Sequence, residues 1–233
     1  MRKTNIEKIK ETAIRFLHLP YECHETLPPQ LHVFHPFLSS SVIMDRAGKM
    51  HDLEKEPECL CEYQDMMEGF INESDIYQIY YVLISKPYCL AFLKYTMNFL
   101  SEKDLAEILA CTWVSVENPN QDANCSLKYL IKIFRKCDKK HLMTKEDYAV
   151  YDNLPETFTI YRGVSVGHNP KGLSWTRSLK TAQWFADRFN LGEEKGYIQT
   201  AVAKKENVLA YFNTRNEDEI VYDTTDLVIE RLG

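Results

Sequence analysis

The sequence lacks any hydrophobic run near the roughly 20 apolar residues that a membrane-spanning helix needs. Glycine and proline are scarce, at 8 and 9 of 233 residues, which excludes collagen-like and low-complexity chains. Basic residues are not in excess either, because 28 Lys and Arg face 34 Asp and Glu, for a net charge of −6. Proteins that bind nucleic acid or anionic membranes through charge need the opposite balance, so neither partner is expected.

Residues 1–17 are not a signal peptide, because their basic residues are not followed by a continuous apolar stretch. Their apolar residues recur instead at helical spacing, behind an expected capping box from Thr4 to Glu7. Seven cysteines form an odd set on such a chain. We therefore expect free thiols and a cytoplasmic location.

No metal site is expected from the cysteine and histidine pattern. The Cys59–Cys61 pair and the nearby His18, Cys23, His24, His32 and His35 suggest one at first sight. However, zinc sites usually contain a Cys-x-x-Cys motif, whereas the spacing here is Cys-x-Cys. The sequence also has no second cysteine pair that could complete the set of ligands. A nucleophilic Cys/His/Asp triad stays open from composition alone, without local support.

The chain divides into two differently patterned regions. Residues 1–150 are mainly helical in pattern, with an irregular stretch rich in Pro, His and Ser at 27–41 and with Pro87 separating two helices. Residues 151–233 carry short β-branched or aromatic runs, interrupted by one helix at 178–190. The pattern predicts an α+β fold with a mostly antiparallel sheet. In the helix, Trp184 and Phe185 are expected to pack in the core rather than shape a pocket.

Three short segments of the second region carry the candidate chemistry. They are Tyr161-Arg162-Gly163, Ser174-Trp175-Thr176 and Glu217-Asp218-Glu219, each on or just before a predicted strand. Individually, each is an ordinary strand or turn sequence. In this order and strand context, with the helix after the second segment, they resemble the Arg–Ser–Glu class of mono-ADP-ribosyltransferases, over about residues 156–231.

Residues 172–189 and 196–213 also resemble a phage- and prophage-encoded branch of that superfamily. The resemblance implies a β-sandwich ADP-ribosyltransferase core at 151–233, with the helical region 1–150 packed on it. It implies NAD as substrate and a protein acceptor, which for a phage protein would be a host protein.

The resemblance also implies a role for each matched residue. Glu219 would stabilise the oxocarbenium-like transition state as nicotinamide leaves the ribose, and Ser174 would orient that carboxylate. Arg162 would grip the dinucleotide phosphates, and Gly163 would allow close backbone approach to the nicotinamide amide. Thr176 would assist Ser174 in holding the dinucleotide.

Glu217 occupies the position that faces the acceptor in this class. On a strand, residues i and i+2 share a face, so Glu217 and Glu219 are expected to point into one cleft. The resemblance associates Glu-x-Glu with arginine acceptors, since a carboxylate pairs with a guanidinium and can take its proton. Trp175 is bulkier than the class residue, but it should point away from the cleft.

Two other readings remain open. An NAD glycohydrolase would use the same Glu219 with water as the acceptor. A non-catalytic interaction module would keep the fold without turning over NAD, although the full set of Arg162, Ser174, Glu217 and Glu219 argues against it.

Overall fold

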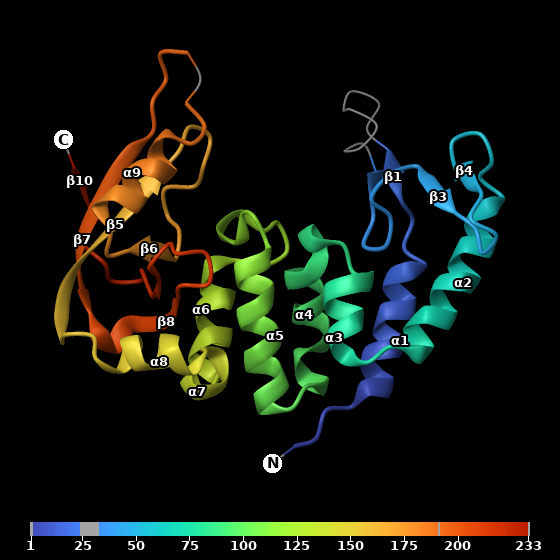
Figure 1. Ribbon diagram of the computed structural model, residues 1–233, viewed down its shortest axis with the longest axis horizontal. Coiled ribbons are helices and arrows are strands. Elements are labelled where there is room, and N and C mark those ends of the chain that lie inside the picture. Colours follow the sequence, from blue (N-terminus) through green and yellow to red (C-terminus); the bar gives the residue numbers. More distant parts are fainter. Residues whose placement is uncertain (1, 24–32, 191, 233) are drawn as a thin grey trace. The chain divides into compact units, whose positions relative to one another are not determined.

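The computed structural model describes residues 2–23, 33–190 and 192–232, and Figure 1 labels the elements along the chain. The chain divides into two compact units, Met1–Ser101 and Glu102–Gly233. Helices after residue 101 thus share a unit with the C-terminal sheet, and several of them pack against its strands. The division at residue 150 rested on a change of pattern and stays a prediction about domains. No helix in the described ranges is both long and apolar enough to cross a membrane.

The first unit begins with helix α1 (Ile6–Leu17), which confirms the predicted amphipathic helix. Its buried apolar residues are Ile9, Ala13 and Leu17. The predicted capping box from Thr4 to Glu7 is wrong. Asn5 is the N-cap residue, and its side chain accepts a hydrogen bond from the backbone N–H of Lys8 at 3.1 Å.

Four short strands that were not predicted follow, and one of them, β2, lies in the stretch at 27–41 that was expected to be irregular. β1 (Glu22–Cys23) pairs with β2 (Val33–Phe34), and β3 (Val42–Met44) pairs with β4 (Met50–Asp52), both antiparallel. Strands of two or three residues are too short to show the alternation by which a sequence announces a strand. The expectations for His24 and His32, and for the side chain of Cys23, fall outside the described residues.

The rest of the first unit is helical. Pro87 lies in a short 3₁₀ turn that separates two helical segments, as predicted. The elements are α2 (Cys59–Glu73), α3 (Ile76–Gln78), a π turn (Ile79–Leu83), 3₁₀ turns (Lys86–Tyr88 and Met97–Phe99) and α4 (Cys89–Thr96).

The second unit opens with four helices and a 3₁₀ turn. These are α5 (Glu102–Ser115), the 3₁₀ turn (Pro119–Gln121), α6 (Leu127–Lys136), α7 (Lys139–Leu142) and α8 (Lys145–Asp152). Trp113 of α5 and Phe134 of α6 are buried and meet edge to face, with ring centroids 5.1 Å apart. This contact fixes the end of α5 inside the core of the second unit.

The sheet of this unit has six strands in the order β10-β7-β5-β6-β9-β8. Every neighbouring pair is antiparallel, so the predicted α+β fold with an antiparallel sheet is confirmed. The strands are β5 (Thr157–Val164), β6 (Ser174–Thr176), β7 (Tyr197–Lys204), β8 (Val208–Phe212), β9 (Glu219–Tyr222) and β10 (Glu230–Leu232). A further 3₁₀ turn, Lys205–Asn207, joins β7 to β8.

The expected sandwich of two sheets is not what the described strands form, since all six belong to one hydrogen-bonded sheet. Its centre is narrow, because β5 and β6 share only the pair Tyr161–Thr176. By contrast, β5 pairs with β7 along its whole length. On both sides of this single pair, the backbones of β5 and β6 are not paired with each other and can therefore line a pocket.

Helix α9 (Leu179–Asp187) packs on β5 and β7, and Ala182 and Ala186 form its buried face. The approach is close at Gly163, where a Cβ atom would lie 2.1 Å from the carbonyl oxygen of Ala182. Trp184 lies on the other side of the helix and is 54% exposed. The expectation that Trp184 packs in the core is therefore wrong.

Candidate functional site

The three segments singled out in the sequence meet at the narrow join of the sheet. Arg162 and Gly163 lie on β5, Ser174 and Thr176 lie on β6, and Glu219 begins β9. Thr176 is directly opposite Glu219 in the ladder between β6 and β9. The antiparallel register thus brings together residues that are far apart in the sequence.

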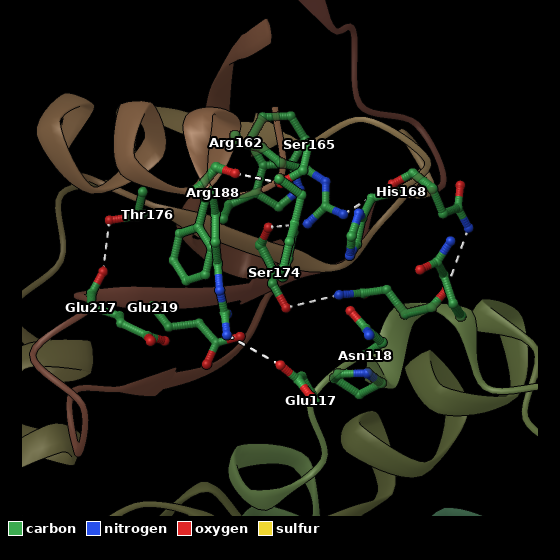
Figure 2. A pocket seen from close by; sticks show the side chains of 18 of the residues that line it. Glu117, Asn118, Arg162, Ser165, His168, Ser174, Thr176, Arg188, Glu217 and Glu219 are labelled. Carbon is green, nitrogen blue, oxygen red and sulfur yellow. Dashed lines mark hydrogen bonds and ion pairs between the residues drawn. The ribbon is translucent and has the colours of Figure 1, made fainter. Parts of the chain in front are cut away.

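A pocket opens at this join, and all of its lining residues belong to the second unit (Figure 2). Its volume is about 860 Å³, a figure that includes space open to solvent. The sheet supplies one wall and the segment Trp113–Gln121 contributes another part of the lining. All six sequence candidates line it: Arg162, Gly163, Ser174, Thr176, Glu217 and Glu219.

Glu219 is a buried carboxylate, with only 7% of the residue exposed. Burial raises its pKa, while hydrogen bonds with Ser174 and Trp113 act in the opposite direction. The indole N–H of Trp113 donates to Oε1 at 3.0 Å. The carboxylate is therefore fixed in position by two donors, and its charge is poorly solvated.

Ser174 is itself held by a residue outside the sheet. The Nδ2 of Asn120 donates to the Ser174 hydroxyl oxygen at 3.0 Å, and the Asn120 Oδ1 accepts from the backbone N–H of Leu173 at 2.6 Å. One amide thus spans the start of β6 and sets where the hydroxyl sits. Since that hydroxyl bonds Glu219, Asn120 acts on the carboxylate through Ser174.

Arg162 is buried behind β6 and does not extend a free guanidinium into the solvent. Its Nη1 donates to the carbonyl of Ser174 at 2.6 Å, and its Nη2 donates to the carbonyl of Asn169 at 3.0 Å. Its buried Nε has no hydrogen-bond partner among the described residues. Burial lowers the pKa of Arg162 to about 10, so the group stays charged at neutral pH, with Glu219 favouring the charge.

These contacts give Arg162 a structural role in addition to the predicted binding of phosphates. The guanidinium ties β5 to β6 and to the loop that follows β5, where the strands share a single residue pair. Gly172 makes room for it, because a Cβ there would lie 2.2 Å from Nη2. Binding of a phosphate by Arg162 stays a prediction, with its remaining N–H groups as the available donors.

Gly163 and Thr176 also make contacts that sequence reasoning did not assign to them. The missing side chain of Gly163 is required by the backbone of α9, as described above. The Thr176 hydroxyl donates to the backbone carbonyl of Glu217 at 2.9 Å and accepts from the backbone N–H of Ser178 at 3.1 Å. Thr176 therefore holds the loop that presents Glu217, whereas contact with a dinucleotide stays a prediction.

Glu217 and Glu219 both line the pocket, but not through strand alternation. Asp218, between them, has a φ of +49°, in the left-handed region that side chains rarely adopt. Its carboxylate is paired with Arg177 at 2.9 Å, and its backbone N–H donates to the Asn213 side chain at 3.0 Å. The chain thus turns sharply just before β9, and that turn, rather than a shared strand face, brings the two glutamates to one pocket.

The Glu217 carboxylate already binds a guanidinium. The Nη2 of Arg215 lies 2.9 Å from Oε2 of Glu217, and the Glu217 side chain is 20% exposed. Arg215 also lines the pocket. The Glu217 carboxylate is thus less buried than that of Glu219, and it is paired with the Arg215 guanidinium.

Several lining residues were missed by sequence reasoning. They are Trp113, Asn120, Arg188, Arg215 and His168. The ring of His168 is partly buried and is stacked on the Phe189 ring, with ring centroids 5.1 Å apart. Arg188 pairs with Glu117 at 3.1 Å (Figure 2). Its guanidinium also lies over the Trp184 ring. No local motif marks these residues, since most come from a separate helix or turn.

Comparisons with models of known protein families, with curated proteins and with solved structures found no match to this chain. In the described residues, the one cluster of three side chains suited to a metal ion belongs to the first unit, whereas the pocket is lined by residues of the second.

Proposed function

We propose that the protein is an NAD-dependent mono-ADP-ribosyltransferase, and that Glu219 is its central carboxylate. The observation that carries the proposal is the buried Glu219, oriented by Ser174 and Trp113, in a pocket that Arg162 also lines. The resemblance of the three sequence segments to the Arg–Ser–Glu class supplies the substrate. This is the same set of residue types in the same order, now lining one pocket.

The chemistry explains why a buried carboxylate is useful. In the reaction, the bond between nicotinamide and ribose breaks, and nicotinamide leaves as a neutral base with the bonding electron pair. The ribose carbon then carries developing positive charge. A fixed, poorly solvated carboxylate stabilises that charge more than it stabilises the ground state, which lowers the barrier.

The acceptor that fits the site best is a protein arginine. A nitrogen of the guanidinium would attack the ribose carbon and lose a proton to the Glu217 carboxylate. Support comes from Arg215, whose guanidinium sits 2.9 Å from that carboxylate. Glu217 is thus placed to bind a planar cation, and an incoming arginine would take the place of Arg215.

The proposal is tested with purified protein, NAD labelled in the adenylate part and a bacterial lysate. Wild type should label one or more proteins, and Glu219→Gln should not. Glu217→Gln should end transfer while it leaves release of nicotinamide to water. Glu206→Gln serves as the matched control, because Glu206 is exposed and does not line the pocket.

The other outcomes separate the competing readings. Release of nicotinamide without labelled protein, tested also with a small guanidine as acceptor, would indicate an NAD glycohydrolase. Absence of NAD turnover together with absence of a thermal shift at high NAD would indicate a non-catalytic module. A ligand at 100 times its dissociation constant should add about 2.7 kcal/mol to the free energy of unfolding.

A further inference from the structure

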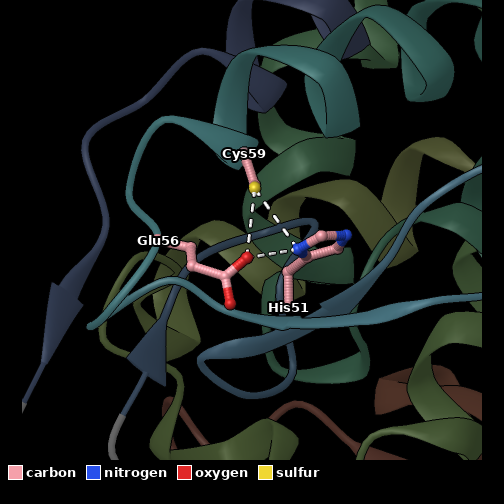
Figure 3. A group of neighbouring side chains, drawn as sticks. All are labelled: His51, Glu56 and Cys59. Carbon is pink, nitrogen blue, oxygen red and sulfur yellow. Dashed lines mark hydrogen bonds and ion pairs between the residues drawn. The ribbon is translucent and has the colours of Figure 1, made fainter.

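The first unit contains a cluster of side chains that the proposed function does not use. His51 lies on β4, Glu56 lies in the turn after it, and Cys59 is the first residue of α2 (Figure 3). One ligand atom from each lies within 4.8 Å of the others. We propose that these three residues bind a Zn²⁺ ion, with Asp45 as the partner that orients His51.

The distances between the three atoms support a metal site. Sγ of Cys59 lies 3.4 Å from Nδ1 of His51 and 3.8 Å from Oε2 of Glu56. In a tetrahedral zinc site, bond lengths of about 2.0–2.3 Å put a sulfur about 3.5 Å from a neighbouring nitrogen or oxygen ligand. Both sulfur distances are thus within a few tenths of an ångström of the expected value.

The third distance is that of a hydrogen bond, which the ion would replace. Nδ1 of His51 lies 2.6 Å from Oε2 of Glu56. Two ligands on a tetrahedral zinc would lie about 3.3 Å apart, so Glu56 needs to withdraw by roughly 0.7 Å. Its side chain is 43% exposed and its movement is therefore not blocked by tight packing.

The surroundings of His51 are those of a metal-binding histidine. Its other ring nitrogen, Nε2, lies 3.1 Å from Oδ2 of Asp45. The other oxygen of Asp45 accepts backbone N–H groups from Ala47 and Lys49 at 2.8 and 2.9 Å. A histidine that binds a metal usually donates its second N–H to a carboxylate, which fixes the tautomer and points the first nitrogen at the ion.

The charges also balance. Both ring nitrogens of His51 face carboxylate oxygens, and each needs a proton there when the metal is absent. On binding, the Nδ1 proton and the thiol proton of Cys59 leave to solvent, and the ion brings two positive charges in their place. The net charge of the cluster is therefore unchanged, and the buried imidazole exchanges its Nδ1 proton for the ion.

Zinc is the ion that this mixture of ligands favours. Thiolate and imidazole ligands select against Mg²⁺ and Ca²⁺, which prefer oxygen ligands only.

A metal ion bound at this site would stabilise a small hydrophobic core of the first unit. The three-residue strands β3 and β4 are too short to be stable as an isolated hairpin. A compact hydrophobic cluster joins them to α2; its buried members are Val33, Leu38, Ile43 and Leu53, and Cys59 packs against it. An ion held between His51 of the hairpin and Cys59 of the helix would tie these elements together. We therefore expect zinc to stabilise the first unit.

The test is a Co²⁺ titration of the full-length, reduced protein, followed by displacement with Zn²⁺. We expect one Co²⁺ per chain, with a thiolate-to-cobalt absorption band that Cys59→Ser loses and Cys61→Ser keeps. Cys61 is the matched control, since it is exposed and two residues away on the same helix. Zn²⁺ should bleach the band and raise the melting temperature.

A second pair of variants tests the orienting role of Asp45. Asp45→Asn should weaken zinc binding by about 10–100-fold, and Asp65→Asn, at an exposed position of α2, should not. If Cys59→Ser does not fold, Glu56→Gln on the exposed side of the cluster should still weaken Co²⁺ binding relative to wild type, because it removes one proposed ligand and keeps the thiolate. A missing cobalt band in wild type, or a band that persists in Cys59→Ser, would overturn the proposal.

Discussion

Replacing Glu219 with Gln should stabilise the protein at neutral pH, although the same change should end its proposed activity. The reason lies in the burial of the carboxylate, which raises its pKa above the value of 4.5 that it has when unfolded. Glutamine has nearly the same shape and still offers an oxygen to the Trp113 indole. It removes the buried charge without leaving a cavity.

The sign and size follow from proton linkage. Between pH 4.5 and the raised pKa of Glu219, the folded state binds more protons than the unfolded state. The free energy of unfolding of wild type should therefore fall as pH rises through this window, by up to about 1.4 kcal/mol per pH unit. Glu219→Gln lacks this slope, so the difference should grow with pH and then level off.

Urea denaturation of both proteins at several pH values from 4 to 8 measures this difference. Other titrating groups are shared by the two proteins and cancel. The exposed Glu206→Gln control should follow wild type throughout. Parallel curves for wild type and Glu219→Gln would refute the reasoning, and a wild type that gains stability over the variant with rising pH would show the carboxylate to be stabilised by its partners.

Three further predictions concern the scaffold of the site. Gly163→Ala should lower the free energy of unfolding, measured by urea denaturation, by about 3 kcal/mol or more, because the new Cβ meets the backbone of α9. Gly69→Ala should be tolerated, because the space around Gly69 is open. Equal stabilities of the two variants would contradict this prediction. Burial lowers the pKa of Lys139 from 10.5 to about 8, so the unfolded state binds more protons than the folded state between these pH values. Wild type should therefore gain stability relative to Lys139→Met as pH rises from 8 to 10. A stability difference that does not change with pH would contradict this prediction. Trp113→Phe removes the donor to Glu219, a charge-assisted bond worth about 1.5–3 kcal/mol, and should move the acidic limb of NAD cleavage to higher pH, which an unshifted pH profile would disprove.

The two longest strands of the C-terminal sheet could be predicted from the sequence because they are strongly patterned. Residues 157–164 and 197–204 alternate clearly, and both are strands. The short strands at 33–34 and 42–44 could not be predicted, because two or three residues carry no period. Their pairing depends on contacts that only the folded first unit supplies.

The candidate site was predictable only as far as its strand segments. Ser174 and Glu219 could be named from the order of three motifs, since the chemistry demands those side chains. Trp113 and Asn120 could not, because they come from a helix and a turn more than 50 residues before Ser174 and have no motif of their own. The left-handed backbone conformation of Asp218 could not be predicted either, because the strand pattern does not show the turn in which Asp218 pairs with Arg177.

The same gap explains the cluster in the first unit. A search for paired cysteines overlooks His51, Glu56 and Cys59, because two of the three ligands are not cysteines and the spacing matches no common motif. Only the hairpin brings His51 beside the start of α2. The ligand set is visible in the fold and not in the sequence pattern.

The most direct test of the central claim is the rate at which the purified protein releases nicotinamide from NAD in the presence of a guanidine acceptor. Wild type and the exposed control Glu206→Gln should release it at equal rates and form an ADP-ribosylated guanidine. Glu219→Gln should be slower by at least about 10²-fold, the usual cost of removing one group that stabilises transition-state charge. Equal rates for wild type and Glu219→Gln, or absence of NAD cleavage in wild type, would contradict the account.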